Sequence, residues 1–158
     1  MHRQLAKGEA AETLLDGHFS DRFKIRPATR EEQRLGIDRY FTQFTTGKTY
    51  TIEYKTDWTA SRTGNAFVET VSVDTMNIPG WIYTSQAEWL IYYVPGRQVI
   101  YIGRLSALQE MIEEWVERFG PEKAIPNDGY FTQGILVPLE EFGRQAVKIE
   151  TLNAIPQY

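Results

Sequence analysis

The sequence contains no cysteine and only two histidines, His2 and His18. The absence of cysteine excludes disulfide bonds, zinc sites built from thiolates and a cysteine nucleophile. Two isolated histidines leave no histidine-based metal cluster. Any metal bound by this chain is therefore expected to have oxygen ligands.

The sequence also lacks a long apolar run. Its N-terminal segment, MHRQLAKGEAAETLLDGHF, has no apolar stretch of the kind found in a secretory leader. No segment approaches the roughly 20 apolar residues that a membrane-spanning helix needs. We therefore expect no membrane partner and a cytoplasmic location.

The composition is that of an ordinary globular protein, with 42% hydrophobic and 24% charged residues in 158. This length fits one domain over residues 1–158. The net charge of −4 argues only weakly against binding to nucleic acid, because cations gather in one short stretch. These cations are Arg22, Lys24, Arg26, Arg30, Arg34 and Arg39. They form either a phosphate-facing edge or a solvated, charge-rich loop.

Two long helices are predicted from apolar spacing. The first covers residues 5–19, with Gly17 as a C-cap. The second covers residues 105–119, where Ser106 and Gln109 fit a capping box. A shorter helix follows the loop after residue 77 and is predicted to be capped by Ser85.

Strands are predicted between these helices, after a charged segment at residues 20–36 that we expect to be mostly loop. The strand-like runs are 37–44, 49–55, 66–72, two apolar runs on either side of Pro95-Gly96-Arg97, and a late run ending at Pro138. The order is helix, three strands, helix, two strands, helix, strand. This order predicts an α+β (mixed α/β) domain.

An acid and a base lie two residues apart in the second strand-like run, TYTIEYK. Side chains two apart point to the same face of a strand, so Glu53 and Lys55 share one face while Ile52 and Tyr54 point to the other. A two- or four-residue turn within TTGK would pair position 44 with 49 and Asp38 with Lys55. Asp38, Glu53 and Lys55 would then form one cluster, whereas a three-residue turn would send Asp38 to the opposite face.

Two carboxylates and an ammonium group on one sheet face suit metal-dependent phosphate chemistry. Carboxylate oxygens bind Mg²⁺ while leaving waters in its shell, and Lys55 could orient such a water. The alternative is a surface strand whose Glu53 and Lys55 form ion pairs worth about 0–1 kcal/mol. For a single E-x-K pattern, that structural alternative is the commoner case.

Read together, GIDRYF and IEYK resemble the PD-(D/E)XK nuclease superfamily, which includes restriction endonucleases, Holliday-junction resolvases, repair nucleases and some homing endonucleases. Gly36-Ile37-Asp38 stands where the family has Pro-Asp, and Glu53-Tyr54-Lys55 where it has (D/E)-x-K. The segment EYKTDWTASRTGNAFVE also resembles a bacterial and phage nuclease-like subset, matching it at Thr63, Gly64, Asn65 and Glu69. The resemblance extends from about residue 9 to about residue 103.

This resemblance implies a restriction-endonuclease-like core, a central mixed sheet flanked by helices, and Mg²⁺-dependent hydrolysis of DNA phosphodiester bonds, with Mn²⁺ able to substitute. Asp38 and Glu53 would hold the metal and Lys55 would position the attacking water. Glu12, on the first helix, would be a further catalytic acid, and Glu69 is either an accessory acid or a solvent-side residue.

The DNA-contacting residues are predicted to be Arg62, Thr63 and Asn65, in the loop after the E-x-K strand, together with Arg39. Alternatively, Thr63-Gly64-Asn65 is only a turn without a role in DNA binding, and the sequence fits this interpretation equally well. Many family members dimerise to cut two strands, so the resemblance implies a homodimer or a higher homo-oligomer. Two alternatives stay open: an inactive binding protein on the same fold, and a generic α+β protein with a structural E-x-K.

Overall fold

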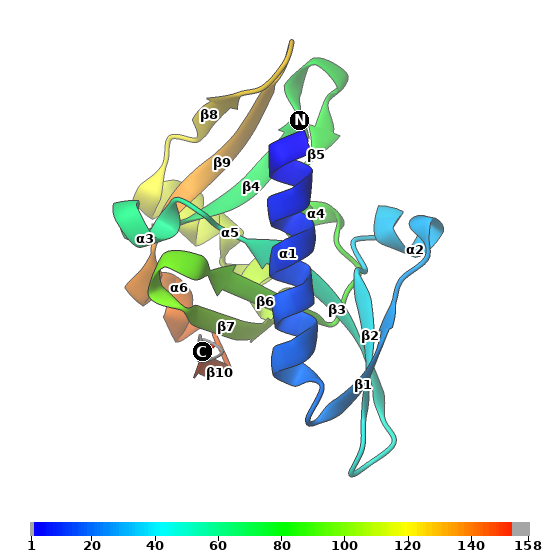
Figure 1. The fold of residues 1–158 in the computed structure, drawn as a ribbon. Coiled ribbons are helices and arrows are strands. Elements are labelled where there is room, and N and C mark those ends of the chain that lie inside the picture. Colours follow the sequence, from blue (N-terminus) through cyan, green and yellow to red (C-terminus); the bar gives the residue numbers. More distant parts are fainter. Residues whose placement is uncertain (1, 153–158) are drawn as a thin grey trace.

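The protein folds around a central six-stranded mixed sheet that is flanked by helices, with a second, four-stranded sheet beside it (Figure 1). The structure is a computed structural model that describes residues 2–152, with side chains from residue 6 onward. The predicted α+β class is confirmed. Among the described residues, none of the helices combines the length and apolar character required to cross a membrane.

The six-stranded sheet has one parallel pair, β3 with β6, and its other neighbouring strands are antiparallel. In spatial order its strands are β1 (Phe23–Pro27), β2 (Arg39–Gln43), β3 (Thr49–Thr56), β6 (Trp89–Val94), β7 (Val99–Arg104) and β10 (Lys148–Thr151).

The four-stranded sheet is antiparallel throughout. Its strands, in spatial order, are β5 (Ile78–Pro79), β4 (Asn65–Val73), β9 (Phe131–Pro138) and β8 (Lys123–Pro126). The helices are α1 (His2–Phe19), α2 (Arg30–Arg34), α3 (Ala60–Thr63), α4 (Trp81–Thr84), α5 (Leu105–Phe119) and α6 (Leu139–Arg144). Two short 3-10 turns, Asp74–Met76 and Pro95–Arg97, connect neighbouring strands.

Helix α1 crosses one face of the six-stranded sheet (Figure 1). Ala11, Leu15 and Phe19 recur every four residues, so they lie on one side of the helix and are buried against the sheet. They contact a cluster that includes Phe41 of β2 and Ile52 of β3. Burying each Leu or Phe side chain contributes about 1.5–3 kcal/mol, and this packing fixes α1 over β2 and β3.

The opposite face of the sheet is covered by α5, α6 and the second sheet. Trp115 of α5, Val68 of β4 and Ile135 of β9 are buried in this second apolar cluster, together with Leu90 and Tyr92 of β6. Both faces of strand β3 are therefore covered, one by α1 and the other by the second apolar cluster. Its even-numbered side chains face α1, and its odd-numbered side chains, Glu53 and Lys55 among them, face the other side.

The helix predicted at 105–119 is confirmed to the residue, and Gly120 is its C-cap. The predicted capping box is wrong, since Arg104 is the N-cap and no side chain caps the helix. Gly17 does not end α1, which continues to Phe19. Ser85 follows the last residue of α4 and does not start it.

The expectation that residues 20–36 are mostly loop is wrong. Strand β1 occupies Phe23–Pro27, where Phe23 and Ile25 alternate toward the apolar cluster while the residues between them are charged. Helix α2 follows and begins with a capping box, in which Thr29 and Glu32 satisfy each other's backbone N–H groups. The charged residues interrupt the apolar pattern and hide both elements from a periodicity analysis.

Glu150 of β10 links this edge strand to the end of α1. Arg22 donates two hydrogen bonds of 2.8 Å to the Glu150 carboxylate, and His18 Nε2 lies 2.7 Å from Glu150 Oε1. The Arg22 hydrogen bonds, together with His18 and the Lys148 ammonium, hold the pKa of Glu150 at about 2. Its ionised form therefore stabilises the folded state.

We predict that Glu150→Gln lowers the free energy of unfolding at pH 7 by about 1–2 kcal/mol, a figure discounted for partial exposure to solvent. Because the folded pKa lies below the usual 4.5, the contribution is complete above pH 4.5 and is lost as the pH falls toward 2. Urea unfolding at pH 7 and pH 3 would measure the difference. An equal difference at both values would contradict this account.

Candidate active site

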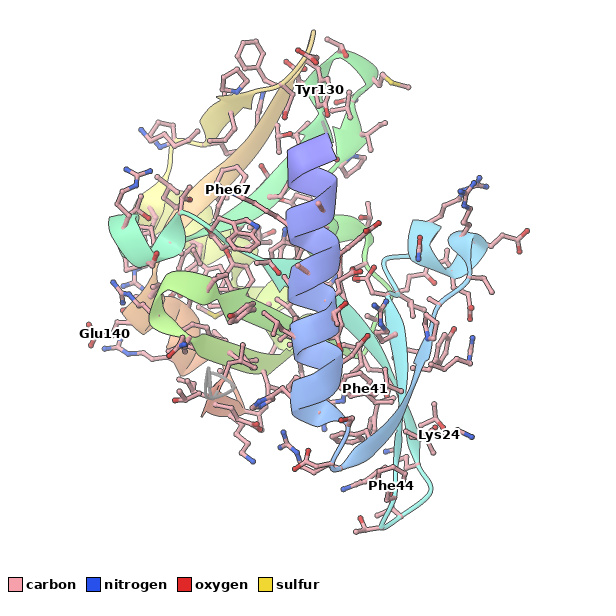
Figure 2. The ribbon with its side chains drawn as sticks, viewed as in Figure 1. Lys24, Phe41, Phe44, Phe67, Tyr130 and Glu140 are labelled. Carbon is pink, nitrogen blue, oxygen red and sulfur yellow. The ribbon has the colours of Figure 1, made fainter. Side chains whose placement is uncertain are left out.

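The loop of the β2–β3 hairpin sets which residues of the two strands lie opposite each other. The loop runs from Phe44 to Gly47, and Phe44 is exposed at its tip (Figure 2). Gly47 has a left-handed conformation (φ 72°), and its N–H donates to the Gln43 carbonyl (2.8 Å). Gln43 N–H in turn donates to the Lys48 carbonyl (2.8 Å), and Thr42 pairs with Thr49.

The predicted pairing of position 44 with 49, and of Asp38 with Lys55, is therefore wrong. The loop begins and ends one residue earlier than expected, so every pairing moves by two residues. Strand side chains alternate with a period of two, and a shift of two keeps Asp38 on the face of Glu53 and Lys55.

Asp38 lies one residue before β2 and beside the backbone of Glu53. Its N–H donates to the Ile52 carbonyl (2.8 Å), and its Oδ2 accepts a hydrogen bond from the Tyr54 N–H (2.8 Å). The first contact fixes the Asp38 backbone beside β3, and the second orients its carboxylate. The other oxygen, Oδ1, is left for another partner.

Glu53 is the buried acid of the site, with a residue exposure of only 4%. Lys55 Nζ lies 3.2 Å from Glu53 Oε1, while Oε2 is buried without a hydrogen-bond partner. The Ser85 hydroxyl lies close enough to the Glu53 carboxylate to lower its pKa, but its hydrogen bond goes to the Gly36 carbonyl (3.1 Å). A buried carboxylate oxygen without a partner is costly, so this atom points to a ligand that the folded chain does not supply.

Burial raises the pKa of both carboxyls in the site. For Asp38, the Tyr54 N–H and the charge of Lys55 oppose that rise. For Glu53, the charge of Lys55 and the Ser85 hydroxyl oppose that rise in pKa, while the negative charge of Asp38 adds to it. The charge of Lys55 acts on both carboxyls, and the strand register puts Asp38 on the face of Glu53 and Lys55, so the three side chains lie in one cluster.

Gly36 lies against Ser85, where the chain turns from α2 toward Asp38. It has a left-handed conformation (φ 79°), and a Cβ at this position would lie 2.5 Å from Ser85 Oγ and 2.7 Å from Ser85 Cα. Only glycine meets both requirements without strain.

We predict that Gly36→Ala lowers the free energy of unfolding by about 2–4 kcal/mol, because it adds a steric clash to the cost of a left-handed alanine. Gly47→Ala is the matched control, since Gly47 has a similar φ of 72° but no atom within 4 Å of its Cβ position. Its expected cost is about 1 kcal/mol. Chemical denaturation measures both, and equal losses would show that the contact with Ser85 is unimportant.

Glu69 of β4 lies at the rim of the cluster, on the second sheet. Burial raises its pKa and the charge of Lys55 lowers it, so the same ammonium group acts on three acids, Asp38, Glu53 and Glu69. Its backbone is held by a close approach of α4, since a Cβ on Gly80 would lie 2.2 Å from the Glu69 carbonyl oxygen. Glu69 is half-buried, which favours the accessory position over the solvent-side one.

Glu12 lies on α1 and contacts Arg39 (Nη2 to Oε2, 3.5 Å). Its pKa is raised, by burial first, and the charges of Arg39 and Asp38 act on it in opposite directions. Asp16, one helical turn later, accepts from Arg39 Nε (3.0 Å) and from the Tyr54 hydroxyl (2.8 Å). Asp16 was missed by the sequence analysis, although its spacing of four from Glu12 places both acids on one helix face.

The predicted DNA-contacting residues divide into two groups. Arg62 and Thr63 lie in α3 and are exposed, and Asn65 begins β4, where it bonds back to Thr63. The side chain of Arg39 is only 11% exposed and is occupied by the α1 carboxylates. DNA contact by these residues stays a prediction.

The basic stretch also makes internal contacts. Arg22 pairs with Glu150, Arg26 lies 3.6 Å from Glu32, and Arg39 pairs with Asp16. These pairs join the residue before β1 to β10, β1 to α2, and β2 to α1. Because β1 and α2 occupy most of this stretch, the alternative of a solvated, charge-rich loop is wrong.

Asp57 is a second buried acid that the sequence analysis did not select. Its two oxygens accept five hydrogen bonds, from Thr59 N and Oγ1, Ala60 N, Phe67 N and the Tyr92 hydroxyl. An aspartate whose side chain accepts from N–H groups two and three residues later is a turn signal, and it could have identified Asp57. Unlike Glu53, Asp57 is fully paired, which marks it as a structural residue.

Among the described residues, no three Asp, Glu or His side chains are disposed to share a metal ion. Asp38 and Glu53 still fit Mg²⁺, which is usually bound through one or two carboxylates and keeps several waters. The main support for a metal here is Glu53 Oε2, a buried oxygen without a hydrogen-bond partner that could bind the ion. A groove of about 490 Å³ lies on the α1 face and is lined by residues such as Phe41 and Trp89, but it includes neither acid.

Comparisons with known proteins give little further information. No protein-family model matches the chain, and no curated protein matches it significantly. A search of solved structures returns "The structure of a bacterial homing endonuclease: I-Ssp6803I", which is 18% identical, with a TM-score of 0.44, over 68% of this chain and 69% of that chain. A likeness at this score is too slight to support either a family assignment or a function.

Proposed function

We propose that the protein is a Mg²⁺-dependent deoxyribonuclease of the PD-(D/E)XK type, built on a restriction-endonuclease-like core. The observation that carries the proposal is the buried, unpartnered Glu53 Oε2, with Asp38 held beside the Glu53 backbone and Lys55 at 3.2 Å from the other oxygen. A purely structural E-x-K would form an exposed ion pair and would have no reason to bury an unsatisfied carboxylate.

Asp38 and Glu53 would hold the ion, with Mn²⁺ as a substitute. A bound Mg²⁺ lowers the pKa of water and neutralises charge that develops on a phosphate. Lys55, whose side chain is 35% exposed, lies where its ammonium group can orient an attacking water and stabilise the charge on the phosphate oxygens. The Tyr54 N–H donates to Asp38 Oδ2 and would orient the carboxylate toward the ion.

DNA is the substrate that this chemistry and the sequence resemblance favour. Arg62, exposed on α3 shortly after the E-x-K strand, and the neighbouring Thr63 and Asn65 are the candidate contacts to the DNA backbone. A homodimer would bring two such sites to the two strands of a duplex. Glu12, on α1 and influenced by the charge of Asp38, and Glu69, on β4 and influenced by the charge of Lys55, are the candidate accessory acids.

The test is cleavage of supercoiled plasmid, and of junction, flap and single-stranded DNAs, with Mg²⁺, Mn²⁺ or EDTA. Cleavage that requires the metal and is lost in Asp38→Asn and Lys55→Ala supports the nuclease. DNA binding without cleavage of any of these substrates would favour an inactive binding protein on the same fold. Neither binding nor cleavage would leave a generic α+β protein.

A further inference from the structure

Arg39 immediately follows Asp38 in the chain, yet its side chain lies on the opposite face of the sheet, beneath α1. The guanidinium donates to Asp16 on that helix through Nε (3.0 Å) and lies 3.5 Å from Glu12. Through Nη1 it also donates to the backbone carbonyl of Asp38 (2.9 Å). One planar group therefore joins α1 to the residue that would bind the metal.

Tyr54 is joined to the same network from the next strand. Its hydroxyl donates to Asp16 Oδ1 (2.8 Å), and its ring lies 5.3 Å from the Arg39 guanidinium carbon. Its backbone N–H is the group that holds Asp38 Oδ2 (2.8 Å). Asp16 thus fixes both Arg39 and Tyr54, and each of these contacts Asp38.

We propose that Arg39 and Asp16 are positioning residues for the Asp38 carboxylate. The inference rests on the proposed function, since it assigns the Asp38–Glu53 pair as the metal site. Arg39 holds the carbonyl of Asp38, and Asp16 holds Tyr54, whose N–H orients the carboxylate. Groups that orient metal ligands in this way typically change metal affinity or activity by about 10–100-fold when they are replaced.

The burial of Arg39 favours this role over a contact to DNA. Its side chain is 11% exposed, and its hydrogen bonds already go to Asp16, Glu12 and the Asp38 carbonyl. Lysine would keep the positive charge but lose the rigid fork that makes these contacts at once. Arg39→Lys therefore separates geometry from charge.

The experiment measures Mn²⁺ binding to the full chain without DNA, by electron paramagnetic resonance of the free ion. Arg39→Lys and Asp16→Asn are each expected to weaken Mn²⁺ binding by about 10–100-fold. Tyr93→Phe is the control and is expected to bind Mn²⁺ as the wild type does. Tyr93 is a buried residue of β6, the strand next to β3, and lies on the same sheet face as Tyr54. The melting temperature of each variant checks that the fold is retained.

DNA affinity in EDTA distinguishes the two roles of Arg39. A positioning role predicts that Arg39→Lys leaves DNA affinity unchanged while Mn²⁺ binding weakens. Weakened DNA affinity with unchanged Mn²⁺ affinity would overturn the inference and make Arg39 a DNA contact. Wild-type protein that binds no Mn²⁺ would overturn the proposed metal site itself, whereas equal Mn²⁺ binding by wild type and both folded variants would overturn only the positioning role.

Discussion

Replacing Glu53 by Gln is expected to abolish metal-dependent DNA cleavage, by at least about 10³-fold, without destabilising the protein. Removing the charge removes a metal ligand, and a bound metal lowers the activation barrier by several kcal/mol because it stabilises the charge that develops in the transition state. Each step of about 1.4 kcal/mol in that barrier corresponds to a factor of ten in rate. The same change relieves the cost of a buried carboxylate with an unpaired oxygen.

Thermal unfolding without metal supplies the second half of this prediction. Each kcal/mol relieved should raise the melting temperature by about 2–4 °C in a protein of this size. Lys55 loses its charged partner, but its side chain is 35% exposed and can be solvated by water. Glu117→Gln, an exposed change on α5, is the matched control and should alter neither activity nor stability.

Full activity in Glu53→Gln would contradict the metal site directly. A large loss of stability in the same variant would show that Glu53 is a structural residue, held by contacts like those of Asp57. The two readouts together separate a functional acid, which costs stability and supplies activity, from a structural one.

Asp57→Ala is expected to give the largest loss of stability, about 3–5 kcal/mol, which corresponds to a fall in melting temperature of about 10 °C or more. The substitution leaves the Ala60 N–H and the Tyr92 hydroxyl without their acceptor in the interior, and it leaves the Phe67 N–H with only the Tyr92 oxygen. These donors come from α3, β4 and β6, so one change releases three elements from each other.

Tyr92→Phe and Asp128→Ala complete this test. Tyr92→Phe removes one of the five hydrogen bonds to Asp57 and should cost only about 1 kcal/mol. Asp128 is exposed in the loop between β8 and β9, and its replacement should be neutral. Urea unfolding of the three variants measures the series. A loss in Asp57→Ala no larger than that in Tyr92→Phe would show that the remaining donors find water instead.

The sequence alone predicts which face of the sheet carries the candidate site. Strand periodicity places Glu53 and Lys55 together, and a turn of even length keeps Asp38 with them despite the error in register. Helix α5 is also predictable to the residue, because its apolar positions recur without interruption and glycine follows its last residue.

The burial of Glu53 could not be predicted, because it depends on segments far away in the chain. The second sheet and α4, contributed by residues 65–84 and 123–138, cover that face of β3. The position of Arg39 depends in the same way on α1, which supplies Asp16. Local patterns describe the periodicity of each element, whereas these contacts are decided by how the elements pack.

Crystals grown with Mn²⁺ and measured for anomalous scattering provide the most direct test of the metal site. The account predicts one strong peak between Asp38 and Glu53, within coordination distance of Glu53 Oε2 and of an Asp38 oxygen. A saturated crystal with no peak there, or with Lys55 closing the space between the two acids, would contradict it.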